Sequence, residues 1–145
     1  MTVINRQRLL NRFVRYAEIA TTADPHQSSY PSSSGQRTLG KVLAEELSAM
    51  SAENVVQDEH ALVYATVPST VGAADVPVVA LVAHMDTSPE APGENVQPQV
   101  IEKYDGGDIP LPNGDRIRES ACPGLKTLIG STLITTDGTT LLGGD

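Results

Sequence analysis

The sequence has 145 residues, a formal net charge of −8 from 10 Lys and Arg against 18 Asp and Glu, and an apolar fraction of 39%. This length predicts one domain with its own core, which must be aliphatic because aromatic residues are scarce. The acidic balance, with no Lys/Arg cluster, argues against nucleic acid and anionic membranes as partners. Cys122 is the single cysteine, which excludes a disulfide framework, and no N-terminal apolar run indicates a signal peptide, so we expect a cytoplasmic protein.

Two amphipathic helices are predicted in the first third of the chain. Apolar residues recur at helical spacing over about residues 5–20, and again from Ser33 or Ser34, either of which could cap the helix, to about Met50. The segment between them, residues 21–35, is rich in Ser, Thr and Pro. That composition is typical of a loop, which could be mobile.

Three β-rich runs follow at residues 54–57, 61–67 and 76–83. The third run is apolar on both faces, which suits a central strand in a sheet that is covered by helices on both sides. Short elements are expected at 99–102 and 109–111, and a final strand at 131–136. Helices followed by strands, one of them buried, predict the α/β class with a mostly mixed sheet flanked by helices.

The third β-rich run ends in the sequence AHMD, which contains His84 and Asp86. Open α/β sheets bind ligands beyond the carboxyl ends of their strands, and residues two apart on an extended chain project to the same side. A neutral histidine can give one ring nitrogen to a metal while its other N–H donates to a carboxylate. The bare H-x-D spacing is a weak motif, however, and a surface His and Asp in a loop also account for it.

Two longer motifs surround this pair, AHMDTSPEAPGENVQPQVIEKYDGGDIPL and LIGSTLITTDGTTLLGGD. They resemble the aminotripeptidases of the co-catalytic two-zinc metallopeptidase family, and the resemblance extends over essentially the whole chain. It implies that residues 1–145 form the N-terminal part of a zinc-peptidase catalytic domain. The remainder of that domain, and the smaller domain that closes over substrate or mediates dimerisation in relatives, would be absent.

Carried over residue by residue, the resemblance implies that His84 is a ligand of one zinc ion. It assigns Asp86 as the catalytic-site carboxylate that holds the imidazole in place, and Asp145 as the aspartate that bridges both Zn²⁺ ions. The complete active site of the family holds two zinc ions and needs further ligands and a Glu-Glu pair, which cannot be located in this sequence. We therefore expect these residues alone to bind zinc weakly and to be inactive.

The resemblance implies an aminopeptidase that releases the N-terminal residue from tripeptides and that could form a homodimer when complete. A related two-zinc carboxypeptidase or N-acyl amino acid deacylase is the nearest alternative, although the block DTSPEAPGENVQPQ favours the tripeptidase. A non-catalytic remnant is the alternative from another class. A truncated α/β domain leaves hydrophobic strand edges and helix faces uncovered, which predicts poor solubility when these residues are expressed alone.

Several other residues invite a functional interpretation that the sequence does not support. His26 and His60 are expected to be solvated surface residues, and Cys122 an inert thiol. The pair Gly106-Gly107 and the residue Asp137 are expected to form turns.

Overall fold

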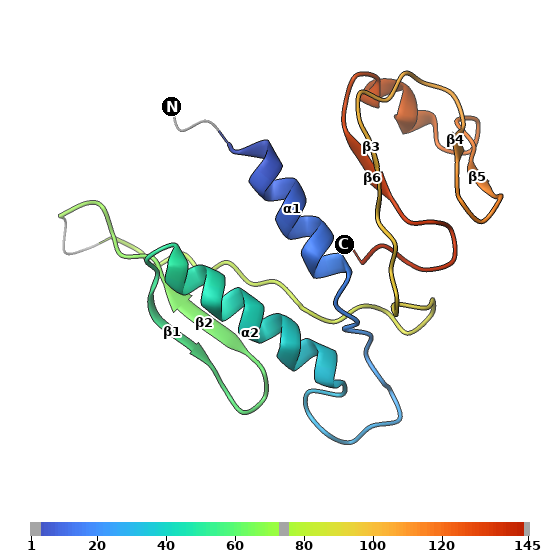
Figure 1. Cartoon of the computed structure of the whole chain (residues 1–145). Helices are drawn as coiled ribbons and strands as arrows, with labels where there is room; N and C mark the ends of the chain where they lie inside the picture. The colour runs from blue at the N-terminus through green and yellow to red at the C-terminus, as the bar shows by residue number, and fades with distance from the viewer. Residues whose placement is uncertain (1–3, 73–75, 144–145) are drawn as a thin grey trace. The chain divides into compact units, whose positions relative to one another are not determined.

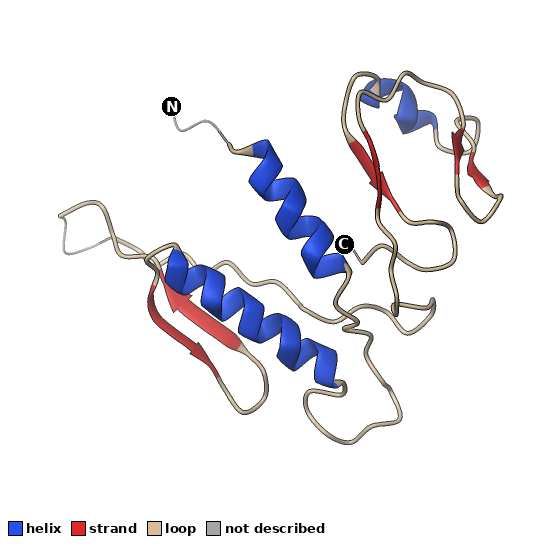
Figure 2. Cartoon of the chain, in the orientation of Figure 1, coloured by secondary structure: helices blue, strands red, loops and turns tan. Residues whose placement is uncertain are grey.

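The protein is described by a computed structural model that covers residues 4–72 and 76–143. The chain divides into two compact units, one formed by Thr21–Thr87 and the other by the segment up to Ala20 together with the segment from Ser88 onward. Helices and small antiparallel sheets are mixed along the chain (Figure 2), which confirms the predicted α/β class. Among the described residues, no helix has the length and apolar character needed to span a membrane.

The unit Thr21–Thr87 is built from one helix and one hairpin (Figure 1). Helix α2 (Ser34–Ala49) contacts both strands of the antiparallel pair β1 (Glu53–Gln57) and β2 (Val63–Thr66). Leu39 on the helix and Ala61 in the turn between the strands are buried. These three elements lie within a few residues of their predicted positions.

A glycine permits the close approach of α2 to the hairpin. A Cβ atom placed on Gly40 would lie 2.1 Å from the side-chain nitrogen of Gln57, so any larger residue must displace that side chain. The same Gln57 nitrogen donates a hydrogen bond to the backbone carbonyl of Arg37 at 3.0 Å. The Gln57 side chain therefore joins β1 to α2, and it fits there because Gly40 has no side chain.

The other unit contains the first helix and two short strand pairs. Helix α1 (Arg6–Ala17) begins at Asn5, whose side chain accepts a hydrogen bond from the backbone N–H of Arg8 and so caps the helix. Strands β3 (Gln99–Ile101) and β6 (Leu133–Thr135) pair antiparallel, as do β4 (Ile109–Pro110) and β5 (Arg116–Ile117). A 3-10 helix, Pro123–Leu128, lies between β5 and β6 in the chain.

Tyr104 is the buried centre of the loop between β3 and β4. Its backbone N–H donates to the carbonyl of Ser131, and its hydroxyl donates to the carbonyl of Gly107. Burial raises the pKa of the Tyr104 hydroxyl above its ordinary value, and the nearby carboxylates of Glu119, Asp105 and Asp108 raise it further. The pair Gly106-Gly107 adopts positive φ at both residues, as expected for a turn.

The prediction of a buried central strand at residues 76–83 is wrong. The segment has no ladder partner among the described residues, and the side chains of Val78, Leu81 and Val82 are more than nine-tenths exposed, at 96%, 96% and 93%. In place of one mixed sheet, the described chain has three separate two-stranded antiparallel sheets. A run of apolar residues indicates that a segment is favoured in a buried position. A β-strand forms, however, only where its backbone N–H and C=O groups can hydrogen-bond to a neighbouring strand.

Candidate metal site

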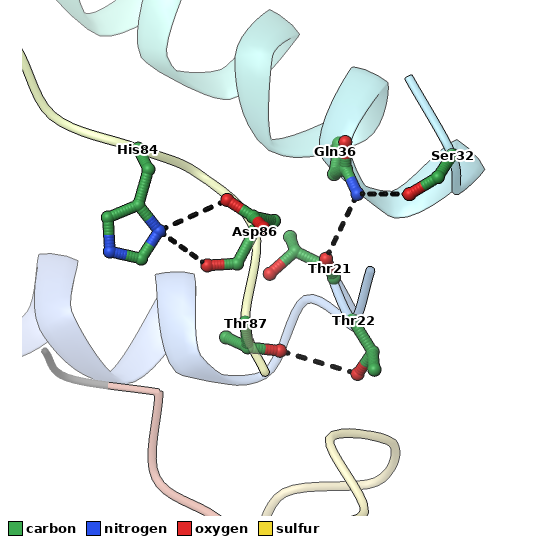
Figure 3. Close-up of polar contacts among 7 residues, drawn as sticks. All are labelled: Thr21, Thr22, Ser32, Gln36, His84, Asp86 and Thr87. Carbon is green, nitrogen blue, oxygen red and sulfur yellow. Dashed lines mark hydrogen bonds and ion pairs between the residues drawn. The ribbon is translucent and has the colours of Figure 1, made fainter. Parts of the chain in front are cut away.

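The structure brings His84 and Asp86 together. The ring nitrogen Nδ1 of His84 lies 2.8 Å from the backbone carbonyl oxygen of Asp86 and 3.1 Å from its carboxylate oxygen Oδ1 (Figure 3). Both oxygens are acceptors, so Nδ1 must carry the proton and donate to them. A metal bound by His84 would therefore coordinate Nε2, which is the orientation that a carboxylate-held histidine ligand adopts.

Both side chains lie where a ligand can approach. The exposed fractions are 56% for the side chain of His84 and 45% for that of Asp86. The two residues lie in a segment that forms neither helix nor strand, and their side chains contact each other, as their spacing predicted. The role of Asp86 as the carboxylate that holds the imidazole stays a prediction.

The backbone immediately after the pair is anchored to the segment that precedes α2. Thr22 and Thr87 form a parallel β-bridge, in which Ala23 N–H donates to Thr87 O at 3.0 Å and Thr87 N–H donates to Thr21 O at 3.4 Å. Their hydroxyls are 3.3 Å apart. Loop composition did not predict this contact, because threonines in a Ser- and Pro-rich segment give no sign of a partner 65 residues away.

The third predicted site residue, Asp145, lies outside the described residues. The segment that leads toward it is fixed at two points: Leu141 N–H donates to Pro92 O at 3.0 Å, and the Thr136 hydroxyl donates to Thr140 O at 3.0 Å. Pro92 belongs to the first motif and Leu141 to the second, so this hydrogen bond joins part of one motif to part of the other.

The donors present fit part of a zinc site. A histidine with its Nδ1 held by an aspartate is a suitable zinc ligand, but a catalytic zinc needs about three protein ligands and an open position. Within residues 4–72 and 76–143, no three His, Cys, Asp or Glu side chains gather closely enough to hold a metal ion. The ring of His60 instead contacts that of Tyr30, with centroids 5.5 Å apart, and the thiol of Cys122 is free and exposed.

The described chain thus mixes helices with small antiparallel sheets and contains a histidine whose ring contacts an aspartate two residues later. The particular similarity is to peptidase T. The chain is 48% identical to peptidase T of Geobacillus kaustophilus (strain HTA426) over 142 residues, which are 97% of this chain and 34% of that protein. The predicted resemblance to aminotripeptidases is thereby confirmed.

Two further relatives agree with this similarity. Peptidase T of Edwardsiella ictaluri (strain 93-146) is 48% identical over 138 residues, or 94% of this chain and 33% of that protein. Peptidase T of Vibrio parahaemolyticus serotype O3:K6 (strain RIMD 2210633) is 45% identical over 140 residues, or 96% and 34%. The chain thus spans about a third of the length of the curated relatives it matches. No protein-family model matches the chain.

Proposed function

We propose that this chain is the N-terminal part of the catalytic domain of a zinc-dependent aminopeptidase that releases the N-terminal residue from tripeptides. His84 would hold zinc through Nε2, Asp86 would orient its ring, and Asp145 would be the carboxylate that two zinc ions share. The observation that carries the proposal is the contact of His84 Nδ1 with both oxygens of Asp86, at 2.8 and 3.1 Å. The similarity to peptidase T, which extends over 97% of the chain, supports the choice of substrate.

The chemistry requires the metal and these residues together. When bound, zinc would supply Lewis-acid chemistry that makes water nucleophilic toward a peptide carbonyl. The contribution of Asp86 is to keep the Nδ1 proton in place, because a histidine protonated at Nε2 cannot ligate through that atom. The remaining ligands and the general base belong to the part of the relatives that this chain does not span. The 145 residues therefore bind zinc weakly and do not turn over substrate.

The proposed location is the cytoplasm. Cys122, the one cysteine of these 145 residues, is a free thiol, which is the usual state of cysteines in a reducing compartment. The free N-terminal amine and the short length of a tripeptide are the features that the enzyme selects. The complete protein could form a homodimer.

The test is a peptide-release assay on the product of the open reading frame continued past codon 145. We expect release of the N-terminal residue from tripeptides, loss of release with a chelator, and recovery with added zinc. The variant His84→Ala should lose activity by several orders of magnitude, whereas His26→Ala, which changes a histidine outside the motif, should not.

Other outcomes of this assay would assign the chain a different activity or none. Removal of a C-terminal residue, or deacylation of N-acyl amino acids, would replace the aminopeptidase by the related two-zinc hydrolases. A product that is inactive toward all these substrates, with zinc present and the fold intact, would contradict the proposal and favour a non-catalytic remnant.

A further inference from the structure

The peptide unit between Asp86 and Thr87 is held from both sides. Its carbonyl oxygen accepts the Nδ1 proton of His84 at 2.8 Å, and its N–H donates to the carbonyl of Thr21 at 3.4 Å. A peptide unit is rigid and planar, and in the trans form its C=O and N–H point in opposite directions. The hydrogen bond that orients the Thr87 N–H therefore also orients the Asp86 carbonyl that accepts from His84.

The carbonyl of Thr21 is itself held by helix α2. The side-chain nitrogen of Gln36 donates to this carbonyl at 3.4 Å and to the Ser32 hydroxyl at 3.2 Å (Figure 3). Thr21 is buried, with 3% of its surface exposed, so its carbonyl has little access to water and depends on protein donors. Gln36 supplies one of these donors and Thr87 another.

Thr22 adds a side-chain contact to the same bridge. Its hydroxyl lies 3.3 Å from the hydroxyl of Thr87, beside the backbone hydrogen bond from Ala23 N–H to Thr87 O. Side-chain and backbone contacts thus limit the movement of Thr87, and with it the Asp86–Thr87 peptide. The bond from Thr87 N–H to Thr21 O also polarises the Asp86–Thr87 peptide, which strengthens the Asp86 carbonyl as an acceptor.

We propose that Gln36 and Thr22 are positioning residues that hold His84 in its Nδ1–H tautomer, through Thr21, Thr87 and the Asp86–Thr87 peptide. The role of this tautomer in zinc binding rests on the proposed function, but the hydrogen-bonded chain itself does not. Residues that orient a metal ligand from the second layer typically change metal affinity by about 10- to 100-fold when substituted. Gln36 and Thr22 act on the Asp86 carbonyl only through Thr21 or Thr87, so we expect about a tenfold loss at most.

The experiment is nitrogen NMR of the histidine rings in the 145-residue chain at mildly alkaline pH, where histidine is neutral and its two tautomers are distinguishable. In the unsubstituted chain the His84 ring should be mainly protonated at Nδ1. In Thr22→Val and in Gln36→Ala the two ring-nitrogen shifts should move toward each other as the Nδ1–H fraction falls. Thr22→Ser retains a hydroxyl and should restore the original shifts.

Two matched variants separate positioning from general stabilisation. Thr38→Val removes a threonine hydroxyl bond to Ser34 O on the same helix, and Gln57→Ala removes a part-buried amide bond to Arg37 O in the same unit. Both should lower thermal stability about as much as the test variants while leaving the His84 tautomer unchanged. If Gln36→Ala does not fold, the Thr22→Val and Thr22→Ser pair decides the question.

The proposal is overturned if the folded test variants keep the original His84 shifts, or if the matched variants move them equally. A parallel zinc titration separates this result from the proposed function, since the tautomer is measured without metal. An unsubstituted chain whose His84 ring does not respond to zinc would count against the proposed function and leave the positioning result standing.

Discussion

The side-chain nitrogen of Asn113 lies 3.0 Å from the backbone carbonyl oxygen of Gly138, and this contact joins the turn of the β4–β5 hairpin to the turn that follows β6. The same nitrogen donates to the carboxylate of Asp115 at 2.8 Å, while the backbone N–H of Asn113 donates to Asp137 O at 3.0 Å. A Cβ atom on Gly138 would lie 2.5 Å from the Asn113 amide. These hydrogen bonds therefore join the β4–β5 hairpin to the turn at Asp137 and Gly138, which lies within the second motif.

Substitution of Gly138 by Ala should release this contact. Gly138 has a φ of +95°, which disfavours alanine, and the added methyl must also displace the Asn113 amide. We expect a loss of about 1–3 kcal/mol in the free energy of unfolding, measured by denaturant titration. Gly107→Ala is the matched control, because Gly107 has a φ of +83° and no atom within 4 Å of an added Cβ. Equal losses in both variants would show that the Asn113 contact contributes nothing.

Tyr104 should make the stability of its loop sensitive to alkaline pH. Burial raises the pKa of its hydroxyl above the ordinary value of 10.0, with further contributions from Glu119, Asp105 and Asp108. The neutral hydroxyl is favoured in the folded state, so its stabilisation is complete below the unfolded-state pKa and is lost as the pH rises through the folded-state pKa. The absorbance titration of tyrosinate should lose its latest component in Tyr104→Phe. The control Tyr30→Phe, at a tyrosine that is 63% exposed, should leave the Tyr104 component in place.

Asp137 should make the stability of the fold sensitive to acidic pH, whereas Tyr104 makes it sensitive to alkaline pH. The side-chain and backbone hydrogen bonds from Thr139 lower the pKa of Asp137 below its ordinary value of 3.8. This stabilisation is present above the unfolded-state pKa and is lost as the pH falls through the lower folded-state pKa. In Thr139→Val, the carboxyl carbon of Asp137 should titrate at higher pH in NMR, closer to its ordinary value. An unchanged midpoint would mean that the hydroxyl does not stabilise the carboxylate.

The exposed apolar segment at residues 76–83 should govern self-association of the chain. Leu81 is 96% exposed, so Leu81→Lys should change the free energy of unfolding by no more than about 0.5 kcal/mol. It should nevertheless reduce dye binding and light scattering, because a long apolar edge without a partner favours aggregation. Leu39→Ala, at a residue only 8% exposed, is the contrasting variant and should lose about 2–5 kcal/mol. Unfolding of the chain by Leu81→Lys would show that the segment is buried in solution.

The helices were predictable from the sequence because their signal is local. In α1 and α2 the apolar residues recur with the helical period, and each hydrogen bond joins residues four apart, so no distant segment is needed. Structure and prediction differ there by a few residues, as at the end of α1, which is Ala17 and not Ala20. Helix ends depend on capping contacts that the periodicity does not encode.

The strands were less predictable because each depends on a partner elsewhere in the chain. The apolar segment at 76–83 was predicted as a central strand and has no partner among the described residues, whereas β5 (Arg116–Ile117), with one apolar residue, was missed and pairs with β4. For the site, the extended spacing of His84 and Asp86 predicted their contact. The support from Thr22 and Gln36 could not be predicted, since it is created by a bridge between distant segments.

The most direct test of the central claim is a zinc titration of the 145-residue chain, followed by the ring-nitrogen NMR signals of all three histidines. We predict that the Nε2 signal of His84 shifts at lower zinc concentration than any signal of His26 or His60, and that Asp86→Asn weakens this response. If the three histidines respond alike, or if His84 binds through Nδ1, the assignment of His84 as a zinc ligand held by Asp86 is contradicted.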